Sequence, residues 1–131
     1  MQANQINALV LAYIGDSVLE VLVRDHLVLN KNIQKVNDLQ KNAVSYVGAK
    51  GQAAFMKKCK EENWFTEEEF ALYRRGRNAK GRKVVKNMDV ATHNESTGFE
   101  AVIGYLHLEQ RQDRIKEIFE IYHQFIEEMN V

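Results

Sequence analysis

Residues 9–23 read LVLAYIGDSVLEVLV and form the most apolar stretch of this 131-residue chain. Only Asp16, Ser17 and Glu20 interrupt its run of apolar and small side chains. A helix that is apolar on nearly every side is usually buried inside a fold. The stretch therefore predicts a buried helix, which we expect to cover residues 5–29.

Helical spacing continues through the rest of the chain, which contains no proline. Thr66 and Glu69 have the spacing of a capping box, which predicts a helix over residues 66–75. Two more helical segments are expected before this one. Asn37 or Asp38 can cap the first of them, and the second passes through Phe55. Later helices are expected over residues 97–110 and 115–129, and the polar residues 76–94 are expected to form a long loop or a short helix plus a loop. The last helix shows the clearest apolar stripe, formed by Ile115, Ile118, Phe119, Tyr122, Phe125, Ile126 and Met129. These patterns predict an all-α fold in which residues 1–131 form one domain.

The composition favours a compact protein that needs no disulfide. Forty-five per cent of the residues are hydrophobic, and Cys59 is the single cysteine. We see no signal peptide, no run of roughly 20 apolar residues that could span a membrane, and no glycine-rich phosphate loop. We therefore expect a cytoplasmic protein with no membrane partner and no small-molecule organic cofactor.

Basic residues are concentrated in one segment, although the 18 basic and 18 acidic residues give a formal net charge of zero. Residues 74–83 contain six basic side chains, no acidic one and no aromatic one. An ordinary solvated loop is the simplest interpretation, but six like charges repel one another unless a polyanion neutralises them. Phosphate contacts to duplex RNA, without base stacking, fit this composition. The candidate RNA-binding residues are Arg74, Arg75, Arg77, Asn78, Lys80, Arg82 and Lys83.

Asp16 is unusual because a carboxylate is costly inside an apolar helix unless a metal ion, a base or backbone donors compensate it. Glu20 lies four residues further on and shares its helix face. Aspartate is also a favoured helix cap, so Asp16 could instead hold backbone amides at a helix start. The spacing leaves both interpretations open.

Glu100 is the second candidate, beside the apolar residues of the helix expected over residues 97–110. Thr97 and Glu100 have capping-box spacing, and this pattern alone favours a capping role. If Asp16 and Glu100 instead meet in space, two carboxylates could hold Mg²⁺, a cation that prefers oxygen ligands and suits phosphodiester hydrolysis.

Two motifs resemble those of the ribonuclease III domain family. Residues 13–20, YIGDSVLE, resemble its signature helix, approximately E-x-x-E-F-L-G-D-[SA]-[VL]-L. Residues 98–106, GFEAVIGYL, resemble its second motif, approximately D-x-F-E-A-[LV]-I-G-A-[LIV]-[YF]-L. Residues 74–80, RRGRNAK, look like a loop of the short bacterial branch, Mini-ribonuclease III, which lacks a separate domain for binding double-stranded RNA. The resemblance covers essentially the whole chain.

The resemblance implies a homodimer that cleaves double-stranded RNA, with one acidic centre per subunit. It implies that Asp16 and Glu100 are the catalytic metal ligands, with Mg²⁺ as the cofactor and Mn²⁺ as the alternative. Leu9, Ala12 and Thr97 stand where the wider family has acidic residues, so the centre is expected to be a reduced one.

We expect Glu20 and Thr97 to support the Asp16–Glu100 centre. The expected reaction is hydrolysis by a metal-activated water, in line with the departing 3′ oxygen, which leaves 5′-phosphate and 3′-hydroxyl ends. The branch implies precursor large-subunit ribosomal RNA as the substrate. One alternative is a non-catalytic RNA-binding or ribosome-assembly protein on the same scaffold, and another is a purely structural helical dimer.

Overall fold

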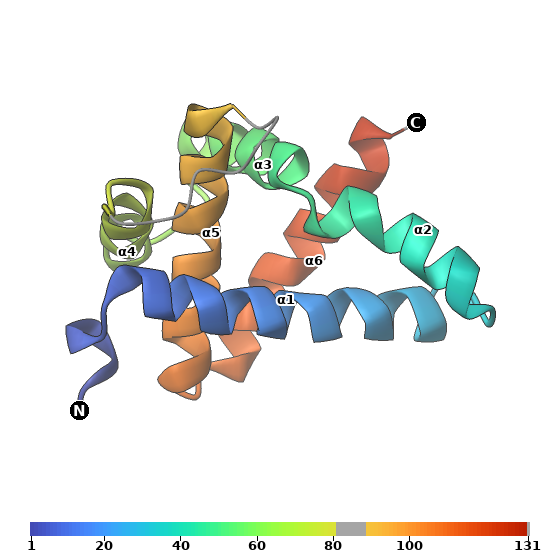
Figure 1. Ribbon diagram of the computed structural model, residues 1–131, viewed down its shortest axis with the longest axis horizontal. Helices are drawn as coiled ribbons and strands as arrows, with labels where there is room; N and C mark the ends of the chain where they lie inside the picture. Colours follow the sequence, from blue (N-terminus) through green and yellow to red (C-terminus); the bar gives the residue numbers. More distant parts are fainter. Residues whose placement is uncertain (81–88, 131) are drawn as a thin grey trace.

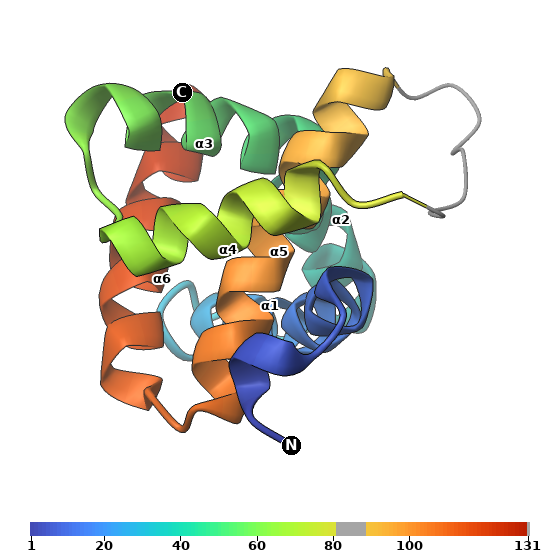
Figure 2. The same cartoon turned by 90° about the vertical axis from the view of Figure 1, so that its left-hand side faces the viewer.

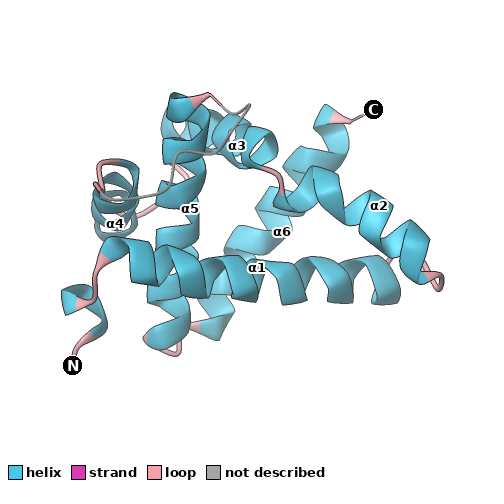
Figure 3. Cartoon of the chain, viewed as in Figure 1, coloured by secondary structure: helices cyan, strands magenta, loops and turns pink. Residues whose placement is uncertain are grey.

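The computed structural model describes residues 1–80 and 89–130, and within these ranges every regular element is a helix (Figures 1 and 3). The order of the elements confirms the predicted all-α class. The short 3₁₀ helix and the six α-helices are η1 (Ala3–Gln5), α1 (Ala8–Leu29), α2 (Val36–Val47), α3 (Ala49–Glu62), α4 (Glu67–Arg77), α5 (Val90–Leu108) and α6 (Gln112–Met129).

Helix α5 is the centre of the fold. Ten of its residues are buried, including the whole stretch from Ser96 to Phe99 and from Ala101 to Leu106. Helices α1 and α4 cross it on different sides, and α3 and α6 also pack against it (Figures 1 and 2). Aromatic rings join these layers: Phe99 of α5 stacks on Tyr122 of α6, and Phe55 of α3 contacts both rings edge-on. The helix is therefore a rigid support for any side chain that it carries.

The capping box predicted at Thr66 is confirmed at the start of α4. The Thr66 side chain accepts a hydrogen bond from the Glu69 amide, and the Glu69 carboxylate accepts one from the Thr66 amide. The Glu69 side chain is 1% exposed and also accepts two hydrogen bonds of 2.8 Å from Arg114 of α6. Arg114 compensates the buried charge, and its bonds help to keep the pKa of Glu69 low against the effect of burial.

Several predicted boundaries differ from the structure, most of all the start of α5, which was expected near Thr97. Helix α2 begins at Val36 after Lys35, one to two residues before the caps proposed at Asn37 and Asp38. Helix α5 begins at Val90, so the predicted loop over residues 76–94 is helical at both ends. Asp89 starts α5, because its carboxylate accepts hydrogen bonds from the amide and the hydroxyl of Thr92. A polar segment therefore becomes helical through its cap and through packing against its neighbours rather than through an apolar stripe.

Helix α1 is only partly buried, which corrects the prediction of a fully buried helix. Leu11, Leu19 and Val23 are at most 1% exposed, but Tyr13 is 76% exposed and Val21 is 57% exposed. The apolar side chains of α1 therefore lie on two faces, one packed in the core and one on the surface of this chain. Large apolar side chains gathered on a surface usually mark an interaction site.

The final helix follows its predicted pattern. Ile115, Ile118, Tyr122 and Ile126 are buried on one face of α6, while Met129 at its end is 45% exposed. Among the described residues, no helix is both long and apolar enough to cross a membrane.

Candidate active site

Asp16 lies in the middle of α1, with its side chain exposed. The cap of this helix is Asn7, whose side chain accepts a hydrogen bond from the Leu9 amide at 2.8 Å. The capping interpretation of Asp16 is therefore wrong, and so is the expectation that its carboxylate is buried. The carboxylate is instead accessible from solvent, as a residue that meets a substrate must be.

Glu100 lies in the middle of α5, ten residues after the helix begins. Thr97 is also inside the helix, where its hydroxyl donates a hydrogen bond to the His93 carbonyl at 3.0 Å. The predicted capping box of Thr97 and Glu100 is therefore wrong. Glu100 is free of any role at a helix end, so its partly exposed carboxyl needs another explanation.

Gly15 and Gly104 bring α1 and α5 into direct backbone contact. A Cβ atom added to Gly15 would lie 1.8 Å from the Glu100 carbonyl oxygen, and one added to Gly104 would lie 1.8 Å from the Leu11 carbonyl oxygen. Only hydrogen fits at these two positions, because real Cβ contacts are not made below 3.0 Å. The two glycines stand next to Asp16 in α1 and one turn beyond Glu100 in α5, so the helices cross where the two carboxyl groups are carried.

The carboxyl groups of Asp16 and Glu100 lie within hydrogen-bond reach of each other. Burial, the negative charge of Asp16 and a side-chain hydrogen bond with Asp16 raise the pKa of Glu100 to about 8. At neutral pH and without a bound cation, the Glu100 carboxyl therefore keeps its proton. A cation between the carboxyl groups would reverse this effect, because it favours the ionised form of both.

Gln52 of α3 is a neighbour of Glu100 that the sequence did not reveal. Its side chain is fully buried, and a hydrogen bond from it opposes the rise in the pKa of Glu100. Its amide also accepts a hydrogen bond from the Ser96 hydroxyl at 2.5 Å and donates one to the Val47 carbonyl at 3.3 Å. Gln52 is thus fixed from three sides and orients Glu100. A buried glutamine in an amphipathic helix gives no signal in sequence spacing.

The carboxyl pair has the chemistry of a site for a hard divalent cation. Asp16 and Glu100 offer oxygen ligands from two different helices, and such ions are often held by one or two carboxylates while several waters complete the shell. Glu20, one turn along α1, forms an ion pair with Arg24 at 2.9 Å. The residues present therefore fit a cation that keeps part of its hydration.

The predicted RNA-binding residues occupy different environments. Arg74 is exposed in the last turns of α4, while the Arg77 guanidinium lies 5.2 Å from the centre of the Tyr73 ring. Arg75 donates hydrogen bonds to the carbonyls of Asn4 and Ile6, at 3.0 and 2.8 Å, and so holds the N-terminal segment. Asn78 ends α4 and Lys80 is exposed, whereas Arg82 and Lys83 lie outside the described residues.

Comparison with known proteins gives consistent matches over most of the chain. Residues 9–111 match the Ribonuclease III domain family. The chain is 46% identical to the Mini-ribonuclease 3 of Enterococcus faecalis, covering 87% of this chain and 86% of the relative. It is 45% identical to the Mini-ribonuclease 3 of Staphylococcus aureus, covering 86% and 84%. A crystal structure of a Fusobacterium nucleatum protein superimposes with a TM-score of 0.79 and 27% identity, covering 89% of this chain and 93% of that one.

Proposed function

Because this chain belongs to the ribonuclease III domain family, in its Mini-ribonuclease 3 branch, and is an endoribonuclease acting on double-stranded RNA, we propose that Asp16 and Glu100 form its catalytic centre. The observation that supports this proposal is the meeting of two carboxyl groups where Gly15 and Gly104 let α1 and α5 touch. The proposed reaction is hydrolysis of a phosphodiester bond that leaves 5′-phosphate and 3′-hydroxyl ends.

The proposed cofactor is Mg²⁺, with Mn²⁺ as the alternative, held by Asp16 and Glu100. When bound, such an ion lowers the pKa of water and neutralises the charge that builds on a phosphate during hydrolysis. Asp16, exposed on α1, faces the substrate, while Glu100 is held in place from behind by Gln52. Glu20 and Thr97 remain proposed supporting residues around this pair.

A cleavage assay with duplex RNA, with and without Mg²⁺, tests this function against the alternative of a non-catalytic RNA-binding protein. Cleavage only with Mg²⁺ supports the proposal, and stable binding without cleavage under both conditions supports the alternative. The proposed biological substrate is precursor large-subunit ribosomal RNA in the cytoplasm, which a comparison of cleavage rates between that precursor and an unrelated duplex would test.

Positive charge at the end of α4 is proposed to bind the duplex. We expect the triple change Arg74→Ala, Arg77→Ala and Lys80→Ala to weaken RNA binding and to flatten its dependence on salt. Each phosphate contact contributes about 0.9 to the slope of log affinity against log salt, so losing three contacts should reduce the slope by roughly 2.7. Binding titrations of duplex RNA at several salt concentrations measure this slope.

Arg75→Ala is the matched control for these variants. Its guanidinium is already hydrogen-bonded to the carbonyls of Asn4 and Ile6, so its loss should affect stability more than the salt slope. If the triple variant leaves the slope of log affinity against log salt unchanged, the end of α4 is not part of the RNA-binding surface.

We also propose that the chain forms a homodimer through the exposed apolar side of α1. Val10, Tyr13 and Val21 are 50%, 76% and 57% exposed and follow one another at helical spacing. Asp16 shares this side of the helix with Tyr13, which would bring the two acidic centres of a dimer toward one groove. A second copy of the chain is the occupant that the resemblance implies.

Tyr13→Arg and Val21→Asp are expected to give monomers, because each places a charge in an interface that must be desolvated. Sedimentation velocity across a range of protein concentrations measures the change. Lys57→Asp, on the exposed side of α3, is the control and should leave the oligomeric state unaltered. Dimers that persist in both α1 variants would move the interface elsewhere.

A further inference from the structure

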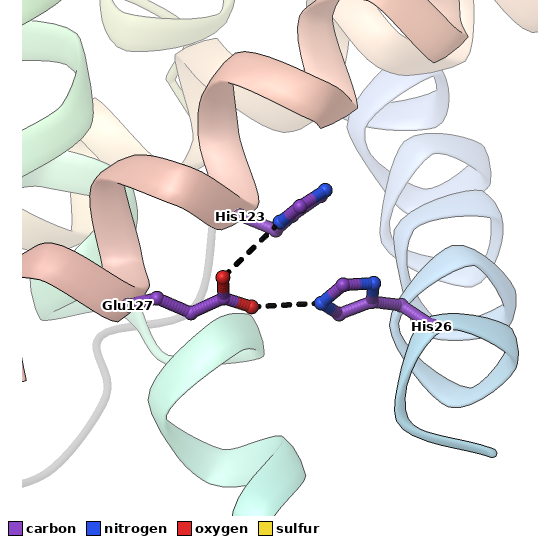
Figure 4. Close-up of side chains that lie close together, drawn as sticks. All are labelled: His26, His123 and Glu127. Carbon is purple, nitrogen blue, oxygen red and sulfur yellow. Dashed lines mark hydrogen bonds and ion pairs between the residues drawn. The ribbon is translucent and has the colours of Figure 1, made fainter. Parts of the chain in front are cut away.

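A second polar cluster lies far from the carboxyl pair, between the ends of α1 and α6. His26 stands one turn before the end of α1, and His123 and Glu127 lie one turn apart on α6 (Figure 4). His26 and His123 are only 5% and 8% exposed, and their rings stack with centroids 4.0 Å apart. Two buried imidazoles in contact call for a specific partner, since each must satisfy two ring nitrogens.

Both imidazoles face the same carboxylate. Nε2 of His26 is 2.7 Å from Glu127 Oε2, and Nδ1 of His123 is 3.4 Å from Glu127 Oε1 (Figure 4). One ligand atom from each of the three residues lies within 4.8 Å of the others. The Tyr46 hydroxyl also donates a hydrogen bond to Glu127 Oε2 at 2.8 Å, and Lys31 Nζ lies 3.7 Å from the same oxygen.

The outer nitrogens of both rings have partners of the kind that orient metal-bound histidines. Nε2 of His123 is 3.0 Å from Glu120 Oε2, and Nδ1 of His26 is 2.9 Å from the amide nitrogen Nδ2 of Asn30, whose amide must turn over to place its oxygen there. A histidine that binds a metal through one nitrogen usually donates its other N–H to a carboxylate or another acceptor. Glu120 provides such an acceptor directly, and the Asn30 amide provides one when its oxygen faces the ring.

The contact between His123 and Glu127 is one that a cation would stabilise. The Glu120 carboxylate can only accept, so Nε2 of His123 carries a hydrogen. In a neutral ring Nδ1 is therefore a lone pair, and it faces a lone pair of Glu127 at 3.4 Å. A proton or a metal ion between these atoms removes the repulsion.

We propose that His26, His123 and Glu127 bind one Zn²⁺ ion at the junction of α1 and α6. Zinc bonds of about 2.0–2.2 Å in a tetrahedral site place neighbouring ligand atoms roughly 3.3–3.6 Å apart, and these three ligand atoms lie within 4.8 Å of one another. Two imidazoles with one carboxylate favour Zn²⁺ over Mg²⁺, which prefers oxygen ligands alone. The Glu127 side chain is 27% exposed, so water can complete the coordination.

This site is separate from the catalytic pair. His26 is ten residues beyond Asp16 on the same helix, which corresponds to about 15 Å along its axis. The ion joins the last turns of two helices that are distant in sequence, so its role is to stabilise the fold rather than to cleave RNA. The inference does not depend on the proposed function of Asp16 and Glu100.

Calorimetric titration of the untagged, metal-free chain with Zn²⁺ tests the site. We expect one ion per chain and a rise in melting temperature. His26→Gln and His123→Gln should abolish this binding, whereas Glu120→Gln, which removes only an outer acceptor, should weaken it about tenfold or more. His107→Gln, which alters an exposed histidine, and Asp16→Asn should both leave the binding unchanged.

A second measurement needs no variant. In the unaltered chain, Zn²⁺ should shift the imidazole NMR signals of His26 and His123 but not those of His107, and Mg²⁺ should shift none of the three. Absence of stoichiometric binding, or binding that survives His123→Gln, would overturn the proposal. Loss of binding in Asp16→Asn would also overturn it, by assigning the zinc to the carboxyl pair.

Discussion

Asp16→Asn and Glu100→Gln are each expected to slow cleavage of duplex RNA by at least about a thousandfold. Each change removes one of the two proposed anionic ligands from a cation whose stabilisation of the transition state is worth several kcal/mol, and about 1.4 kcal/mol corresponds to a factor of ten. Single-turnover cleavage at saturating Mg²⁺ measures the loss. Calorimetry or a fluorescence-detected titration of the metal then shows whether binding of the ion fails in parallel.

The same two variants are expected to fold normally. Because the Glu100 carboxyl keeps its proton at neutral pH, a glutamine replaces a neutral group of similar shape. In Asp16→Asn the negative charge that opposes ionisation of Glu100 is gone, so the free energy of unfolding of the metal-free chain should stay the same or rise. A catalytic defect accompanied by a large loss of stability would therefore contradict the assignment.

Asp25→Asn provides the matched control for Asp16. Asp25 is exposed on the same helix, nine residues further on, and lies beyond the crossing with α5. Its variant should cleave RNA at the rate of the unaltered chain. Full activity of either Asp16→Asn or Glu100→Gln would remove that residue from the catalytic centre.

Local rules were sufficient for the elements whose signals are local. The capping box of Thr66 and Glu69 is a reciprocal interaction over three residues, so its spacing predicted the start of α4 correctly. The apolar stripe of α6 likewise predicted its buried face. The resemblance of the two motifs indicated that Asp16 pairs with Glu100. The spacing of residues alone did not distinguish such a pair from two residues that cap helices.

Features that depend on tertiary structure were missed. The exposure of Asp16 was not predicted, because an all-round apolar helix has the same sequence whether a core or a partner covers it. The polar start of α5 after Asp89 was assigned to a loop, since its helical state depends on α4 packed beside it. Gln52 is separated by 48 positions from Glu100, and only the folded chain brings them together.

Gly15→Ala is the second change expected to have a large effect, and two opposing terms decide its sign. Alanine is favoured over glycine inside a helix by about 1 kcal/mol, which would stabilise α1. Against this, the new Cβ would lie 1.8 Å from the Glu100 carbonyl oxygen and 2.9 Å from the Gly104 amide nitrogen, both backbone atoms of α5. Because neither can rotate away, the helices must separate. We expect a net loss of more than about 3 kcal/mol, at or above the usual range for overpacking, and a fall in melting temperature of the order of 10 °C.

Gly51→Ala tests whether close approach to backbone is the cause. That Cβ would meet the flexible end of the Ile126 side chain at 2.8 Å and the Ser45 carbonyl at 3.0 Å, so we expect a change within about 1 kcal/mol. Gly104→Ala should resemble Gly15→Ala, because its Cβ would lie 1.8 Å from the Leu11 carbonyl oxygen. The double variant should lose clearly less stability than the sum of the two, since one separation of α1 from α5 accommodates both methyl groups. Urea unfolding measures these losses of stability. If the losses of the two single variants add up in the double variant, the two glycines act independently. The crossing of α1 and α5 would then not be the shared element that brings Asp16 to Glu100.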